Sequence, residues 1–230
     1  MKRLVILDLV MEYGNIRDII HPVVLCDESN SVLIDCGCVG SLPEIEKALQ
    51  MNGIGPEAIT DIILTHQDHD HIGAAAAFKG KYPGVGIMAS SIETPYISGD
   101  QKSLRLEQAE QLQKTLPPEQ QAFGEAFCDF LRTVEPVPID RQLHEDDLLP
   151  FCGGCRVIAT PGHTPGHISL YLPELDTIIS GDAMALENGK PVIANPQFTL
   201  NMEEAAASME RLFSYPAKRI ICYHGGVLNL

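Results

Sequence analysis

The sequence has little positive charge. Its 230 residues include 16 lysines and arginines against 31 aspartates and glutamates, which gives a formal net charge of −15 at pH 7. A surface of this sign repels the phosphates of nucleic acids, and no cluster of basic residues relieves it. We therefore expect no nucleic-acid partner, and nuclease or phosphodiesterase chemistry is disfavoured.

Long hydrophobic runs are also missing. No stretch of about twenty apolar residues is present, as a membrane-spanning helix would require. Residues 1–8 are typical of a strand and lack the small-residue cleavage site of a signal peptide. The predicted location is the cytoplasm, with no membrane partner.

Two further absences limit the chemistry. No Gly-x-Ser-x-Gly motif is present, so a serine nucleophile on a strand-to-helix turn is not predicted. The seven cysteines, an odd number, are expected to be free thiols. Cys152 and Cys155 have the spacing of a zinc knuckle or a redox pair. No second pair accompanies them, and we interpret them as part of a turn.

One segment is rich in metal-ligating side chains. Residues 65–73 read Thr-His-Gln-Asp-His-Asp-His-Ile-Gly and follow an apolar run, residues 61–64, that is typical of a strand. Three imidazoles and two carboxylates therefore crowd the loop after a strand. Packing gives no reason for such a cluster, whereas zinc, iron and manganese accept these ligands.

Three later segments share this layout of an apolar run followed by ligand-type residues. The run 155–160 precedes His163 and His167, the run 176–181 precedes Asp182, and the run 218–223 precedes His224. The repetition predicts that several strand ends converge on one metal site.

These segments resemble the signature of the metallo-β-lactamase superfamily, most closely its glyoxalase-II-like and lactonase-like hydrolases. The family pattern reads Thr-His-x-His-x-Asp-His-x-Gly, Gly-His-Thr-Pro-Gly-His, Gly-Asp and Gly-His-Gly. The counterparts, in the same order, are residues 65–73, 162–167, 181–182 and 223–225. The resemblance implies an α+β fold, a four-layer αββα sandwich of two β-rich halves with outer helices. It says less about the substrate, because this fold hosts many reactions.

Carried over residue by residue, the resemblance implies two divalent metal ions. The implied ligands of the first ion are His66, Asp68 and His163, those of the second are Asp70, His71 and His224, and Asp182 bridges both.

Three residues have predicted roles besides binding the metal ions. Asp70 is the predicted catalytic residue, because it would also orient the attacking water. Asp35 and His167 are predicted to support the ligands from behind. A purely structural role fits His167 equally well.

Asp68 departs from the family pattern, which has a histidine at its position, and His69 follows it. A carboxylate hardens the first site and shifts its preference from zinc toward iron or manganese. It also makes a bound water less acidic. His69 is an alternative ligand to Asp68, but we expect it to face solvent or to support a ligand.

The pattern along the chain predicts one domain, residues 1–230, of ordinary size and with enough apolar residues (45%) for a core. The expected elements lie at 21–26 and 31–35 (a hairpin), 41–49 (helix), 72–78 (helix), 85–89 (strand), 167–172 with 177–179 (a hairpin), 202–213 (helix) and 220–221 (strand). In the helix 202–213, apolar residues at 206, 209, 212 and 213 predict the buried face.

Residues from about 95 to 143 fit neither half and are expected to form a helical insert. Helices are predicted at 103–114 and 119–132, separated by two prolines. The insert is either a plain connector or a cap over the metal site. In the second case Tyr96, Phe123 and Phe127 are the tentative lining of a substrate pocket.

The leading functional hypothesis is a hydrolase of a small-molecule ester, thioester or lactone, in which a metal-bridging hydroxide attacks the carbonyl. One alternative is an iron-dependent oxidoreductase resembling persulfide dioxygenases. Another is a non-catalytic metal-binding sensor, if Asp68 weakens the first site. The insert helices would permit a homodimer without requiring one.

Overall fold

The computed structural model describes residues 2–13 and 16–230, and two mixed sheets form its centre. In spatial order, the first sheet contains β1 (Arg3–Ile6), β4 (Val23–Cys26), β5 (Ser31–Ile34), β6 (Asp61–Leu64), β7 (Gly86–Ser90) and β8 (Arg141–Leu143). The second contains β16 (Gly226–Asn229), β15 (Arg219–Cys222), β12 (Thr177–Ile179), β11 (Ile168–Leu172), β10 (Cys155–Ala159) and β9 (Leu148–Leu149).

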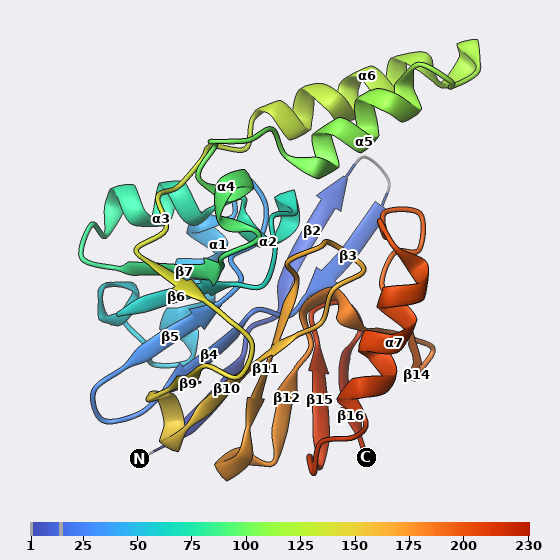
Figure 1. Cartoon of the computed structure of the whole chain (residues 1–230). Coiled ribbons are helices and arrows are strands. Elements are labelled where there is room, and N and C mark those ends of the chain that lie inside the picture. Colours follow the sequence, from blue (N-terminus) through green and yellow to red (C-terminus); the bar gives the residue numbers. More distant parts are fainter. Residues whose placement is uncertain (1, 14–15) are drawn as a thin grey trace.

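Helices cover the outer faces of both sheets. In Figure 1, α1 (Leu42–Met51) and α3 (Ala75–Lys81) lie on the outer side of the first sheet, and α7 (Met202–Leu212) lies on that of the second. One cluster of buried apolar side chains joins the inner faces of the two sheets, with Val32 and Ile63 from the first and Val157 and Leu170 from the second. The predicted α+β sandwich with four layers is confirmed.

The sheet topology places several chain ends at one edge. β5, β6 and β7 run parallel, as do β12 and β15. Because the carboxyl ends of parallel strands meet at the same edge, the segments that follow β6, β12 and β15 can approach one another.

Short elements complete the architecture. They are β2 (Leu9–Tyr13) with β3 (Ile16–Ile20), β13 (Ala185–Glu187) with β14 (Lys190–Val192), and the 3₁₀ turns η1 (Pro56–Ala58), η2 (Phe151–Gly153), η3 (Pro173–Leu175) and η4 (Gly181–Ala183). The sequence analysis assigned no element to the β2–β3 hairpin. All seven cysteines are free thiols, as predicted, and Cys152 lies in the turn η2.

The expected helix 72–78 begins and ends elsewhere. A one-turn helix, α2 (His69–Ile72), occupies part of the histidine-rich segment, and α3 follows it at Ala75. Gly73 lies between them, and its position requires glycine, because a Cβ there would lie 2.3 Å from the backbone nitrogen of Val39. The segment after β6 is therefore a loop only as far as Asp68.

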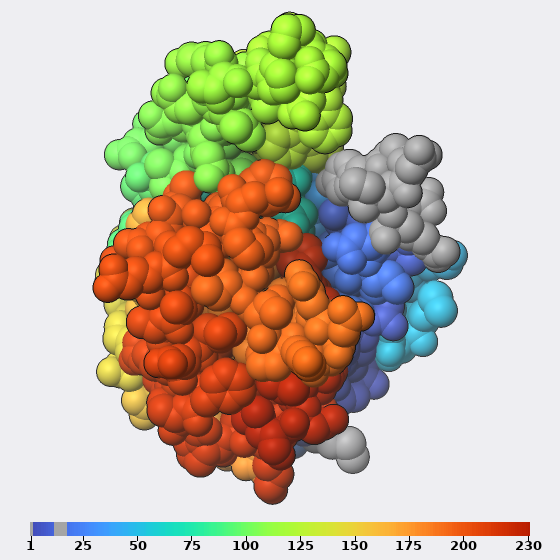
Figure 2. All heavy atoms as spheres, turned by 90° about the vertical axis from the view of Figure 1, so that its right-hand side faces the viewer, coloured from blue at the N-terminus to red at the C-terminus, as the bar shows by residue number. Residues whose placement is uncertain are grey.

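The insert forms a helical hairpin, α5 (Leu104–Gln113) and α6 (Pro118–Arg132), preceded by the short helix α4 (Thr94–Ile97). It has a small core of its own, with Ala109, Cys128 and Leu131 buried. Residues 141–143, which were predicted to end the insert, instead form strand β8 of the first sheet. Figure 1 shows the hairpin above the sheets, and Figure 2 shows it as a green lobe over the C-terminal half. No helix in the described part of the chain is long and apolar enough to cross a bilayer.

Candidate metal centre

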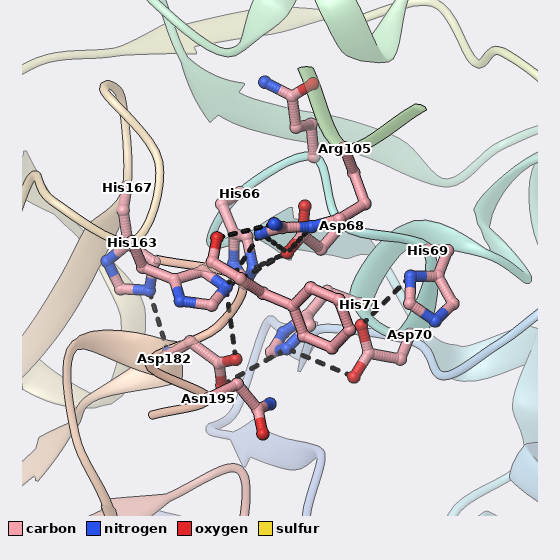
Figure 3. A network of polar contacts seen from close by, with 12 residues as sticks. His66, Asp68, His69, Asp70, His71, Arg105, His163, His167, Asp182 and Asn195 are labelled. Carbon is pink, nitrogen blue, oxygen red and sulfur yellow. Dashed lines mark hydrogen bonds and ion pairs between the residues drawn. The ribbon is translucent and has the colours of Figure 1, made fainter. Parts of the chain in front are cut away.

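The structure brings the predicted metal ligands together at the edge where the strands end. Figure 3 shows these ligands except His224. His66 and Asp68 follow β6, His71 lies on α2, His163 follows β10, Asp182 lies in η4 after β12, and His224 follows β15. We call His66, Asp68 and His163 the first group, and Asp70, His71 and His224 the second group. In each group, one ligand atom per residue lies within 4.8 Å of the others.

The second group contains ligand atoms that have no hydrogen-bond partner. His224 Nε2 lies 3.3 Å from Asp70 Oδ2 and 3.6 Å from Asp182 Oδ1. His71 Nε2 lies 3.4 Å from the same oxygen of Asp182. Neither Nε2 atom nor Asp182 Oδ1 has a hydrogen-bond partner among the described residues, although all three are buried. Buried polar atoms rarely remain unpaired, so this arrangement fits a divalent cation.

The first group is compact but differently partnered. Asp68 Oδ2 lies 3.0 Å from His163 Nε2 and 3.6 Å from His66 Nε2. The same oxygen accepts hydrogen bonds from Arg105, at 3.0 Å from Nε and 2.6 Å from Nη2. Burial alone would raise the pKa of Asp68, but the guanidinium, with the two histidines, holds that pKa well below its usual range.

Asp35 fixes the orientation of His71. Its Oδ2 lies 2.8 Å from His71 Nδ1, while the backbone and hydroxyl of Thr65 donate to its two oxygens. Because Nδ1–H donates to a carboxylate, Nε2 faces the cluster, where its lone pair would bind a metal ion. Burial lowers the pKa of His71, but Asp35, Asp182 and Asp70 raise it well above its usual range.

His167 supports Asp182 through the backbone. Its Nε2 accepts a hydrogen bond from the Asp182 backbone N–H at 2.9 Å, and its Nδ1 lies 2.8 Å from the hydroxyl of Thr160. Gly181 makes this approach possible, since its φ is +52° and a Cβ there would lie 2.7 Å from His167 Nε2. Burial holds the pKa of His167 well below its usual range. Asp35 and His167 thus contact His71 and Asp182, and their supporting role stays a prediction.

His224 and Asp70 have partners of their own. Asp18, which the sequence analysis missed, places Oδ2 3.3 Å from His224 Nδ1. The Tyr223 hydroxyl donates to the backbone oxygen of Asp70. Burial would lower the pKa of His224, but the carboxylates of Asp182, Asp18 and Asp70 raise it to about 10.

Two buried charged residues at the first group were also missed. Arg105 comes from α5, 37 residues after Asp68 in the chain. Glu93 accepts hydrogen bonds from the backbone and side chain of Gln67 and from the backbone of Gly166. Burial raises the pKa of Glu93. The only sequence signal for Arg105 was indirect: a buried carboxylate at position 68 requires a cation nearby.

His69 and the three residues predicted to line a substrate pocket lie in different surroundings. His69 belongs to none of the candidate ligand groups in the described ranges, and its ring packs edge-on against Phe127 and Phe130. Tyr96 and His69 help to line a pocket of about 450 Å³ between the metal segment and the insert. Phe127 does not line this pocket, and neither does Phe123, which lies one turn earlier on α6 and is 77% exposed.

Comparison with known proteins agrees with this geometry. Residues 17–224 match the family model of the metallo-beta-lactamase superfamily. The chain belongs to the metallo-beta-lactamase superfamily. It is 33% identical to the probable metallo-hydrolase YflN of Bacillus subtilis, over 90% of this chain and 80% of YflN.

Three further similar proteins share less sequence identity with this chain. A hydroxyacylglutathione hydrolase of Enterobacter is 26% identical over 87% of this chain, which spans 59% of that protein's length. A superfamily protein from Thermus thermophilus has a TM-score of 0.73 at 22% identity, covering 98% of this chain and 74% of that one. TTHA1623, solved in a di-iron-bound form, has a TM-score of 0.66 at 22% identity, covering 96% of this chain and 94% of that one. At these identities the two structures establish the shared fold.

Proposed function

We propose that this protein is a metal-dependent hydrolase that cleaves the ester, thioester or lactone bond of a small molecule. The observation that carries the proposal is the set of buried, unpartnered ligand atoms at the second group and Asp182. A divalent cation bound there would supply a nucleophile derived from water and would polarise a substrate carbonyl.

The residues of the chain have separate tasks in this proposal. His71, His224 and Asp182 would hold the cation, with Asp35 fixing the orientation of the His71 ring. Asp70, whose Oδ2 lies 3.3 Å from His224 Nε2, would be a further ligand and would accept a hydrogen bond from the attacking water. Zinc, iron and manganese all suit imidazole and carboxylate ligands, so the proposal covers any of the three metals.

The pocket and the relatives support the proposed substrate class. The pocket beside His69 is of a size that suits a small molecule. Relatives named hydroxyacylglutathione hydrolases support an acyl group as the part that is transferred to water. A cytoplasmic location and a homodimer remain predictions.

The experiment is a hydrolysis screen with metal removal. The purified protein is assayed with an aryl ester, an acyl-glutathione thioester and a lactone, before and after treatment with a chelator. We expect turnover of at least one class, its loss on chelation and its recovery when a divalent metal is returned. The Asp182→Asn variant should lose both bound metal and turnover. Asp129→Asn on the exposed side of α6 is the matched control, and it should keep both.

Two results would contradict the proposal. Asp182→Asn with the parent rate on the same substrate would show that the cluster is not used. Oxygen consumption with glutathione persulfide, together with bound iron and no hydrolysis, would favour the oxidoreductase hypothesis instead.

A further inference from the structure

Arg105 is the largest of the fully buried side chains in the described structure, and it is charged; only 2% of its surface is exposed. Its guanidinium has five N–H donors, and each has an acceptor within reach. Nε and Nη2 donate to Asp68 Oδ2, and Nη2 also lies 3.4 Å from His163 Nε2. Nη1 donates to the side chain of Gln108 and, at 2.5 Å, to the backbone oxygen of Phe198. A guanidinium with all donors satisfied holds one fixed position.

The start of α5 is attached to the metal segment, which fixes that position further. The Leu104 backbone N–H donates to the Gln67 side-chain oxygen at 2.7 Å. Gln67 lies between His66 and Asp68 in the chain, and Glu93 holds it from the other side. The Phe198 ring lies 5.0 Å from the guanidinium carbon and covers it. Arg105 is thus attached to the first group through the backbone as well as through its charge.

Two of the three ligand residues of the first group, Asp68 and His163, already contact this cation, whereas His66 Nε2 has no hydrogen-bond partner among the described residues. Asp68 Oδ2 is the oxygen nearest to His66 and His163, and it is the oxygen that Arg105 binds. His163 Nε2 lies against both Asp68 and Arg105, so either tautomer leaves it paired within the protein. An arginine stays protonated at any pH at which the protein folds. A divalent ion bound to Oδ2 and His163 Nε2 would therefore lie against a permanent positive charge.

We propose that Arg105 is the resident cation of the first group, so that the protein binds one metal ion, at the second group with Asp182, and not two. The inference rests on the metal site of the proposed function and is independent of the substrate. It explains why a carboxylate stands where the family pattern has a histidine: Asp68 neutralises the charge of a buried guanidinium, which an uncharged histidine could not do. In the competing arrangement, Asp68 binds a second ion while Arg105 supports it, and the unpartnered His66 Nε2 and Asp68 Oδ1 would be the atoms that hold that ion.

Counting tightly bound ions in the unmodified protein separates these arrangements. The metal-free protein is dialysed against Co²⁺ or Mn²⁺, and the ion content is measured by mass spectrometry of the digested sample. We expect one ion per chain, with the electron paramagnetic resonance signal of an isolated ion. Two ions per chain with a spin-coupled signal would overturn this inference and leave the proposed hydrolase intact. No tightly bound ion would overturn both.

Variants then test the role of Arg105 itself. Asp68→His combined with Arg105→Met restores the family ligand and removes the charge, and we expect two ions per chain and a spin-coupled signal. Arg105→Lys keeps the charge and should keep one ion. Arg132→Met removes an exposed arginine from the same insert, where it pairs with Glu110, and should also keep one ion. A single ion in a folded Asp68→His, Arg105→Met protein would show that Arg105 does not exclude the second metal.

Discussion

The two ends of the metal cluster use similar ligands but satisfy them differently. At the second group, the buried Nε2 atoms of His71 and His224 face Asp182 without a hydrogen-bond partner in the described part of the protein. At the first group, Asp68 and His163 face a buried guanidinium. One end leaves its lone pairs for a cation from solution, and the other supplies a cation from its own chain.

The difference has a structural origin in the insert. The ligands of the second group come from α2 and from the end of β15, and Asp182 comes from η4; all three elements belong to the sandwich. The first group is completed by α5, which lies outside the two sheets. A connection that varies among related folds can therefore change the charge of a site whose strand-end ligands stay in place.

The largest expected effect comes from removing one histidine at each end. His224→Ala should weaken metal binding by more than about 100-fold, since losing a ligand exceeds the 10–100-fold effect of losing a residue that only supports one. His163→Ala, the counterpart at the first group, should leave the affinity for one ion within about threefold, because Arg105 already neutralises Asp68 there. Titration calorimetry of both metal-free variants checks this. Equal losses in the two would show that both ends hold the same ion.

A second comparison removes the partner behind a histidine at each end. Asp35→Asn should weaken metal binding by about 10–100-fold, because an amide N–H cannot accept from His71 Nδ1 and the wrong tautomer would face the ion. Asparagine tolerates the left-handed backbone of position 35, where φ is 59°, so the fold should persist. Thr199→Val removes the hydroxyl 3.4 Å from His163 Nδ1 and should leave metal content unchanged. If the metal content falls in Thr199→Val and not in Asp35→Asn, the ion is held by the first group and not by the second.

The convergence of the ligands was predictable from the sequence, and the resident cation was not. Each ligand-bearing segment follows an apolar run, and parallel strands bring such ends to one edge, so local patterns were sufficient for His66, His163, Asp182 and His224. Arg105 lies on a helix with no strong apolar stripe, and its burial depends on a long-range contact with Asp68. No local pattern carries that information.

The buried face of α7 was partly wrong for a related reason. The predicted face included Ala206 and Phe213, but Ala205 and Ser208 are buried instead, together with Leu212. A Cβ on Gly162 would lie 2.1 Å from the backbone nitrogen of Ala205, so the loop carrying His163 packs directly on the helix. Only a small residue fits at that contact, and apolar periodicity favours large ones.

The insert shows the same limit of local sequence patterns. Helix propensity located α5 and α6 to within two residues. It could not tell which aromatic side chains of α6 face inward, since Phe127 contacts the His69 ring while Phe123 is exposed. That choice depends on how the hairpin docks, which is a tertiary contact.

A smaller effect should follow from loosening the first group alone. Glu93→Ala would leave two backbone N–H groups and the Gln67 amide without their acceptor, at a cost of about 1–3 kcal/mol in the free energy of unfolding. Glu145→Ala, which removes an exposed partner of Arg211, should cost less than about 1 kcal/mol and is the matched control. Urea unfolding of the metal-free proteins measures both. If the folded Glu93→Ala protein loses its metal ion, the two ends are more tightly coupled than the contacts indicate.

The smallest expected effect separates two aspartates that make the same contact within the second group. Asp18 and Asp35 each face the Nδ1 atom of a metal-binding histidine candidate, at 3.3 Å and 2.8 Å. The Asp18 side chain is 54% exposed, whereas that of Asp35 is 1% exposed, so water screens the charge of Asp18 and not that of Asp35. Asp18→Asn should therefore weaken metal binding by less than about tenfold, against the 10–100-fold expected for Asp35→Asn. Moderate salt should reduce the Asp18 effect and not the Asp35 effect, because only the exposed carboxylate is within reach of mobile ions. Calorimetric titrations at low and high ionic strength check this, and equal effects would mean that burial does not decide how strongly a carboxylate supports its histidine here.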